Sequence, residues 1–106
     1  MQSWVTSDGQ IVRRVLTGRS SAFLVSNGDN HVLIDTGHAS GFRQLSRNLA
    51  RLRVPQEKLS ACILTHAHYD HAENAHRIKA AYATTLIIQQ EEAGYLSRGE
   101  IGRAHV

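Results

Sequence analysis

Three histidines and an aspartate lie within six consecutive residues of the sequence. His66, His68, Asp70 and His71 directly follow the apolar run Ala61–Leu64, which predicts a short buried strand. In extended backbone, side chains two residues apart point the same way, so His66 and His68 can converge on one cation. Asp70 and His71, at the turn into a helix, can face a second cation. Imidazole and carboxylate are ligands that suit zinc, iron or manganese, so the cluster predicts a metal site.

Helix capping explains only part of this cluster. Asp70 and Glu73 have the spacing of a capping box that would begin a helix at His71. Capping does not account for His66 and His68, because histidine has little preference for helix caps. Capping is also compatible with metal binding, since one carboxylate oxygen can cap the helix while the other binds a metal ion. We therefore predict metal ligands at these positions.

Hydrophobic patterning predicts the elements that position the cluster. Turn residues at Asp8-Gly9 and Asn27–Asn30 separate four predicted strands, which indicates an antiparallel meander. A predicted helix with one apolar stripe follows and ends before Val54-Pro55. The alternation of strands and helices after it favours an α/β fold built of layers. The predicted strands are 4–7, 11–16, 21–26, 31–35, 60–64 and 84–88, and the predicted helices are 41–52, 71–82 and 91–96.

The size and charge of the chain limit which substrates and partners we expect. The chain has 106 residues, about one modest domain, and a formal net charge of +3 without a polybasic run. We expect a small-molecule substrate, with neither a nucleic-acid nor a membrane partner, and leave the oligomeric state open. Arg43, Arg47 and Arg51 recur on one side of the first predicted helix. A solvated polar face explains that spacing more simply than a phosphate-binding face does.

The cellular compartment is suggested by cysteine usage and by the first residues. The single Cys62 excludes an internal disulfide and, inside an apolar strand, is expected to be a small core residue. The first ten residues lack the pattern of a signal peptide, so we expect a cytoplasmic protein, although an export signal further upstream stays open. We expect His31, His38 and His76 to be exposed.

The motif HxHxDH after an apolar strand resembles the metal-binding signature of the metallo-β-lactamase superfamily. The hairpin over residues 21–37, which ends in Asp35-Thr36-Gly37, is similar to that family's opening hairpin. The resemblance spans about Ser20 to Gly99, with Glu73 standing where many relatives have a small residue. It implies that residues 1–99 are the N-terminal half of an αββα sandwich. Residues 100–106 resemble a translated sequencing adapter, and we interpret them as a non-native tail.

The resemblance also implies a role for each candidate residue. His66 and His68 would hold one zinc ion, and Asp70 with His71 a second, as in relatives of the glyoxalase II type. Asp70 would also be catalytic, accepting a hydrogen bond from the attacking water. Asp35 would be a carboxylate next to the ligands, one that orients an imidazole or braces the metal loop. Ordinary turn chemistry explains Asp35 equally well.

Three functions follow from this resemblance. The first is a metal-dependent hydrolase with two zinc ions, acting on an ester, thioester, amide, lactam or phosphoester. The second is an iron-dependent persulfide dioxygenase or an oxygen-reducing relative on the same fold, since iron or manganese also suits these ligands. The third is a non-catalytic metal-binding fragment. We expect the 106 residues alone to be inactive, because the resemblance places the remaining ligands in the other half of the fold.

Overall fold

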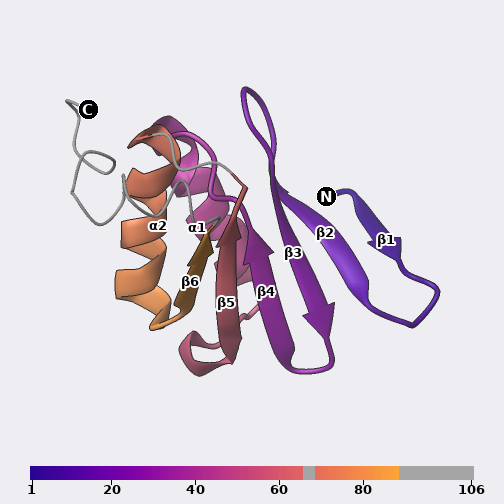
Figure 1. The fold of residues 1–106 in the computed structure, drawn as a ribbon. Coiled ribbons are helices and arrows are strands. Elements are labelled where there is room, and N and C mark those ends of the chain that lie inside the picture. Colours follow the sequence, from indigo (N-terminus) through magenta and orange to yellow (C-terminus); the bar gives the residue numbers. More distant parts are fainter. Residues whose placement is uncertain (66–68, 89–106) are drawn as a thin grey trace.

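The computed structural model describes the backbone of residues 1–65 and 69–88, and the side chains of residues 1–65 and 73–88. Its strands form one sheet in the order β1-β2-β3-β4-β5-β6 (Figure 1). The first four strands pair antiparallel as a meander, and β5 and β6 are added in parallel. The α/β fold and the meander are therefore confirmed. The strands are β1 (Ser3–Val5), β2 (Ile11–Leu16), β3 (Ala22–Asn27), β4 (Asn30–Ile34), β5 (Leu59–Leu64) and β6 (Thr85–Ile88).

Two α-helices connect the parallel strands and lie on the same face of the sheet (Figure 1). Helix α1 (Phe42–Arg51) follows the short 3-10 helix η1 (Ala39–Gly41), and η2 (Gln56–Lys58) leads into β5. Helix α2 (Tyr69–Tyr82) joins β5 to β6. Within the described residues, no helix has the length and apolar character that crossing a bilayer requires.

Helix α1 ends in a hydrogen-bonded cap two residues before Pro55. Arg53 has a left-handed φ of 56°. Its N–H donates to the Ala50 carbonyl at 3.0 Å, and the Val54 N–H donates to the Leu49 carbonyl at 3.2 Å. This is the Schellman arrangement, which satisfies carbonyls that the helix end would otherwise leave unpaired.

The core lies between the helices and one face of the sheet. Leu24, Leu33 and Cys62 are aligned across β3, β4 and β5 and are fully buried. Leu45 and Leu49 of α1 pack there, together with the buried α2 residues Ala75 and Ile78. The apolar stripe predicted for the first helix is thus confirmed at Leu45 and Leu49, because the same spacing that makes a stripe aims it at the sheet.

The opposite face of the sheet is also apolar. Phe23, Ile34, Ile63 and Ile87 are aligned there by the strand register. Trp4 extends this row, with its ring centroid 6.2 Å from that of Phe23. Ile87 is 47% exposed. Among the elements that the structure describes, no helix covers this face.

The start of α2 differs from the prediction. The helix begins at Tyr69, two residues before the expected His71, so Asp70 and His71 both lie in its first turn. An acidic residue there interacts favourably with the helix dipole without being the cap. The carboxylate of Glu73 lies 3.6 Å from the Arg77 guanidinium, one turn along the helix. The predicted helix 91–96 lies outside the described residues.

Candidate metal-binding site

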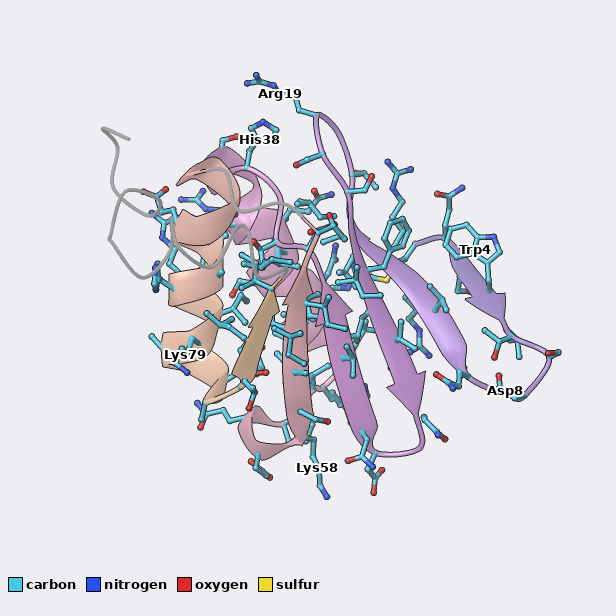
Figure 2. The ribbon with its side chains drawn as sticks, viewed as in Figure 1. Trp4, Asp8, Arg19, His38, Lys58 and Lys79 are labelled. Atoms are coloured by element: carbon cyan, nitrogen blue, oxygen red, sulfur yellow. The ribbon has the colours of Figure 1, made fainter. Side chains whose placement is uncertain are left out.

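The carboxyl ends of β4 and β5 meet at one edge of the sheet because these strands are parallel neighbours. Asp35 follows β4 directly, and Thr65 follows β5. The Asp35 N–H donates to the Ile63 carbonyl at 2.8 Å, which continues the ladder by one residue. His38, labelled in Figure 2, lies at this same end of the molecule. The edge therefore brings the turn after β4 next to the segment that holds the predicted ligands.

Asp35 contacts the residue that immediately precedes His66. Its carboxylate accepts a hydrogen bond from the Thr65 N–H at 2.8 Å. The Thr65 hydroxyl lies 2.7 and 2.9 Å from the two carboxylate oxygens. Such charge-assisted hydrogen bonds are stronger than neutral ones. Asp35 itself has a φ of 65°, which an aspartate tolerates better than most residues do. The carboxylate thus fixes where the segment after β5 begins.

The turn after Asp35 is packed tightly against β2. Gly37 has a φ of 69°, and a Cβ at this position would lie 2.0 Å from Cδ2 of the buried Leu16. Only glycine fits this approach. The next residue is held as well, since the His38 N–H donates to the Ser20 hydroxyl oxygen at 3.1 Å. The turn is therefore fixed from the side of β2.

Helix α2 holds the same turn from the other side. Asn74 is fully buried, and its Nδ2 lies 2.9 Å from the Thr36 carbonyl oxygen and 2.6 Å from that of His38. These contacts tie the turn after β4 to α2 through buried hydrogen bonds. Sequence reasoning missed Asn74. The signal that could have found it is a polar residue directly before Ala75, on the packing side of the helix.

The predicted ligands are only partly described. His66 and His68 lie outside the described residues. Asp70 and His71 lie in the first turn of α2, and their side chains are outside the description. Among the side chains that the structure does describe, His, Cys, Asp and Glu form no group of three that could hold a metal. Of the predicted site residues, Asp35 alone is fully described, at the edge where the ligand segment starts.

Two of the three histidines expected to be exposed, His31 and His38, are partly buried. His31 is partly buried, with its Nδ1 2.7 Å from the hydroxyl of Ser26, its partner across β3 and β4. Burial, and then the charge of Arg13, lowers the pKa of His31. His38 is partly buried by the contacts of its turn, whereas His76 is exposed as predicted.

Cys62 belongs to the core and not to the site. It is fully buried on the helix-covered face of β5. Burial, and secondarily the charge of Asp35, raises the pKa of its thiol to about 12. A thiol that stays protonated is neither a nucleophile nor a good metal ligand, so the prediction of a small core residue is confirmed.

Comparison with known proteins identifies the family. The family model described as the metallo-beta-lactamase superfamily matches residues 15–104. A HARLDQ-motif mutant of the metallo-beta-lactamase from Cronobacter sakazakii is 28% identical, with a TM-score of 0.75, over 97% of this chain and 39% of that one. The MIM-2 metallo-beta-lactamase is 26% identical, with a TM-score of 0.72, over 85% of this chain and 33% of that one. No curated protein matched the sequence.

A third solved structure agrees with these two. SMB-1, a metallo-beta-lactamase bound to 2-mercaptoethanesulfonate, is 25% identical, with a TM-score of 0.62, over 73% of this chain and 29% of that one. The chain spans about two fifths or less of the length of each of these structures. Since the family model covers most of the sequence and the sheet and helices superpose on these folds, the chain belongs to the metallo-β-lactamase superfamily, as an N-terminal part of its fold.

Proposed function

We propose that this chain supplies half of the active site of a hydrolase that uses two zinc ions. His66 and His68 would hold one ion, and Asp70 and His71 the other. The observation that carries the proposal is the contact between Asp35 and Thr65, which fixes the start of this donor segment at the carboxyl end of β5. Asp35 is then the carboxylate that braces the metal loop.

The donor set and its supports fit zinc. Imidazole and carboxylate are common zinc ligands, and a metal site needs its donors held by neighbouring groups. The described contacts supply such support at both ends of the segment. Asp35 holds Thr65 before it, and Asn74 anchors α2, whose first turn contains the last two donors. Both supports act through the same short turn after β4.

The Cronobacter relative gives independent support. That protein has a HARLDQ motif, and the matched mutant has His in place of the motif's Arg and Gln. Residues 66–71 of this chain read HAHYDH, with the same first His, Ala and Asp and with His at both replaced positions. We infer that this chain naturally contains the two imidazoles that the mutation introduces there.

In this proposal each residue has its own role in hydrolysis. Two zinc ions held by these residues would supply hydroxide at neutral pH, since coordination lowers the pKa of water toward ~7. Asp70 accepts a hydrogen bond from the attacking oxygen and so aims it. The N-terminal end of α2 favours negative charge that develops nearby. Asp35 and Asn74 keep the donor segment in place.

The substrate is proposed as a class. The three matched structures are named metallo-beta-lactamases, so a lactam is one candidate, beside ester, thioester and phosphoester. We infer that the choice among them depends on loops outside these 106 residues. The chain on its own is expected to have no useful turnover, because it spans at most 39% of the compared chains and leaves one sheet face uncovered in its described part.

The proposal is tested by metal analysis of the full-length gene product and its variants. His66→Ala and His68→Ala should each lose most of the bound zinc and the hydrolysis of thioester, lactam or phosphodiester substrates. His76→Ala is the matched control, because His76 is an exposed histidine of α2 and should leave both unchanged. Full activity with unchanged metal content in either ligand variant contradicts the proposal. Iron with oxygen uptake, in place of zinc with hydrolysis, would replace it with oxidative chemistry.

A further inference from the structure

A groove with three arginines lies between α1 and α2. It has a volume of about 750 Å³ and is lined by Ala39, Ser40, Phe42, Arg43, Ser46, Arg47 and Arg77. Two of the guanidinium groups come from α1 and the third from α2. We propose that this groove binds a small polyanion that carries two or more phosphoryl groups. The inference does not depend on the metal site.

An amphipathic helix explains only part of this arrangement. Arg43 and Arg47 are exposed and lie four residues apart on α1, as a solvated face would place them. Like charges at this spacing repel each other. A solvated face of α1 does not explain why Arg77, which belongs to α2, lines the same groove. Within the described part of the chain, no carboxylate lines the groove, and neither Arg43 nor Arg47 has an ion-pair partner. Repulsion of this kind is relieved when an anion binds between the guanidinium groups.

The guanidinium of Arg77 is positioned before any ligand arrives. It lies 5.3 Å from the centroid of the Phe42 ring, in a cation–π contact. Its Nη1 donates to the Asn74 side-chain oxygen at 3.4 Å. Its Nη2 lies 3.6 Å from the Glu73 carboxylate, but both side chains are partly exposed, so this ion pair is weak. A planar guanidinium held in this way can present a fork of N–H donors to an oxyanion.

The charge and size of the groove favour a diphosphate over a monophosphate. Guanidinium groups pair with phosphoryl oxygens through two parallel hydrogen bonds, so several guanidiniums suit more than one phosphoryl group. The groove opens broadly to solvent and has more room than a single phosphate ion needs. The hydroxyl groups of Ser40 and Ser46 add neutral donors on the same lining. These features define the ligand by its chemistry: small, with at least two phosphoryl groups.

Calorimetric titration of the full-length gene product with inorganic pyrophosphate tests the proposal. Pyrophosphate should bind at least about tenfold more tightly than inorganic phosphate or citrate, and Arg43→Gln/Arg47→Gln should weaken its binding by about 30-fold. Arg51→Gln is the matched control, since Arg51 is an exposed arginine of α1 outside the groove. His66→Ala should also bind pyrophosphate normally, which separates the groove from the metal ligands. Arg47→Gln alone serves as a second variant if the double variant does not fold.

Several results would overturn the inference. An equal loss in Arg51→Gln would mean a general charge effect. A loss in His66→Ala would mean capture by the metal site. Citrate binding as tightly as pyrophosphate would remove the preference for phosphoryl groups, and a single-stranded RNA that binds more tightly through the same arginines would replace the small ligand. Absence of pyrophosphate binding at millimolar concentration would refute the site altogether.

Discussion

The two faces of the sheet differ in how completely they are covered. Leu33 and Cys62, on the helix side, are fully buried, whereas Ile34 and Ile63, the next residues on the same strands, are only partly buried. Yet both faces are apolar, and residues 32–34 of β4 and 61–64 of β5 are continuous apolar runs. Such runs are typical of parallel strands covered on both sides. We infer that a second layer belongs on the open face, supplied by the part of the fold that this chain does not span.

Removing one side chain from each face gives the largest expected contrast. Leu33→Ala should lower the free energy of unfolding by about 3–4 kcal/mol, because it leaves a cavity in the core. Ile34→Ala should cost only about 1 kcal/mol, since its side chain keeps contact with solvent. Urea unfolding of the 106-residue chain measures both changes. The cost of Ile34→Ala should rise toward that of Leu33→Ala in the full-length gene product, and equal costs in the short chain would contradict the difference between the faces.

Two glycines with similar backbone angles extend the comparison to the turns. Gly37 and Gly28 have φ values of 69° and 61°, but an added Cβ meets buried Leu16 only at Gly37. Gly37→Ala should cost about 3 kcal/mol, the sum of backbone strain and overpacking. Gly28→Ala should cost about 1 kcal/mol, since backbone strain acts alone there. Thermal unfolding of the two variants separates these terms, and similar losses would mean that Leu16 yields to the new methyl group.

Local patterns in the sequence predicted the elements well, because strand alternation and helix stripes are local properties. The meander, the Leu45 and Leu49 stripe and the core position of Cys62 all depend on near neighbours in sequence or on simple burial. The predicted strand 31–35 also ends within one residue of the observed end of β4. Each of these features could be derived without knowledge of distant contacts.

Contacts between distant segments could not be predicted in the same way. The Asn74 side chain donates to the carbonyls of Thr36 and His38, which lie 38 and 36 residues earlier in the chain. No local pattern specifies that pairing. The partial burial of His31 and His38 depends on neighbouring strands and turns. Arg77 joins the arginines of α1 only once both helices pack on the sheet. The placement of the metal ligands themselves stays a prediction.

Asn74 tests how much the helix-covered side depends on one polar contact. Asn74→Ala should lower the free energy of unfolding by about 2 kcal/mol, because it removes the buried hydrogen bonds that the Asn74 amide donates to the Thr36 and His38 carbonyls. His76→Ala, an exposed change on the same helix, should stay within about 0.5 kcal/mol of the parent. Chemical denaturation measures both. If the proposed metal site is correct, Asn74→Ala should also weaken zinc binding by about 10- to 100-fold, as loss of supporting contacts does elsewhere. An unchanged stability would show that water replaces the amide at no cost.

Cys62 gives the effect most specific to the covered face, and it is seen only at alkaline pH. Its thiol has a pKa of about 12 in the folded chain, raised by burial from 9.0. Between these two values the unfolded chain has lost the proton while the folded chain keeps it. The folded state therefore binds more protons, and its stability falls as pH rises. The contribution is complete below pH 9.0 and declines by about 1.4 kcal/mol per pH unit above it.

Cys62→Ala isolates this contribution from other groups that titrate in alkali. Burial also raises the pKa of Tyr82, so both the parent and the variant should lose stability at high pH. Urea unfolding between pH 8 and pH 11 should show the steeper decline in the parent. At pH 8 the thiol is protonated in both states, so the difference there reports packing alone. If the stability of the parent and of Cys62→Ala falls equally with pH across this range, water reaches the thiol. The helix-covered face would then exclude water no better than the open face.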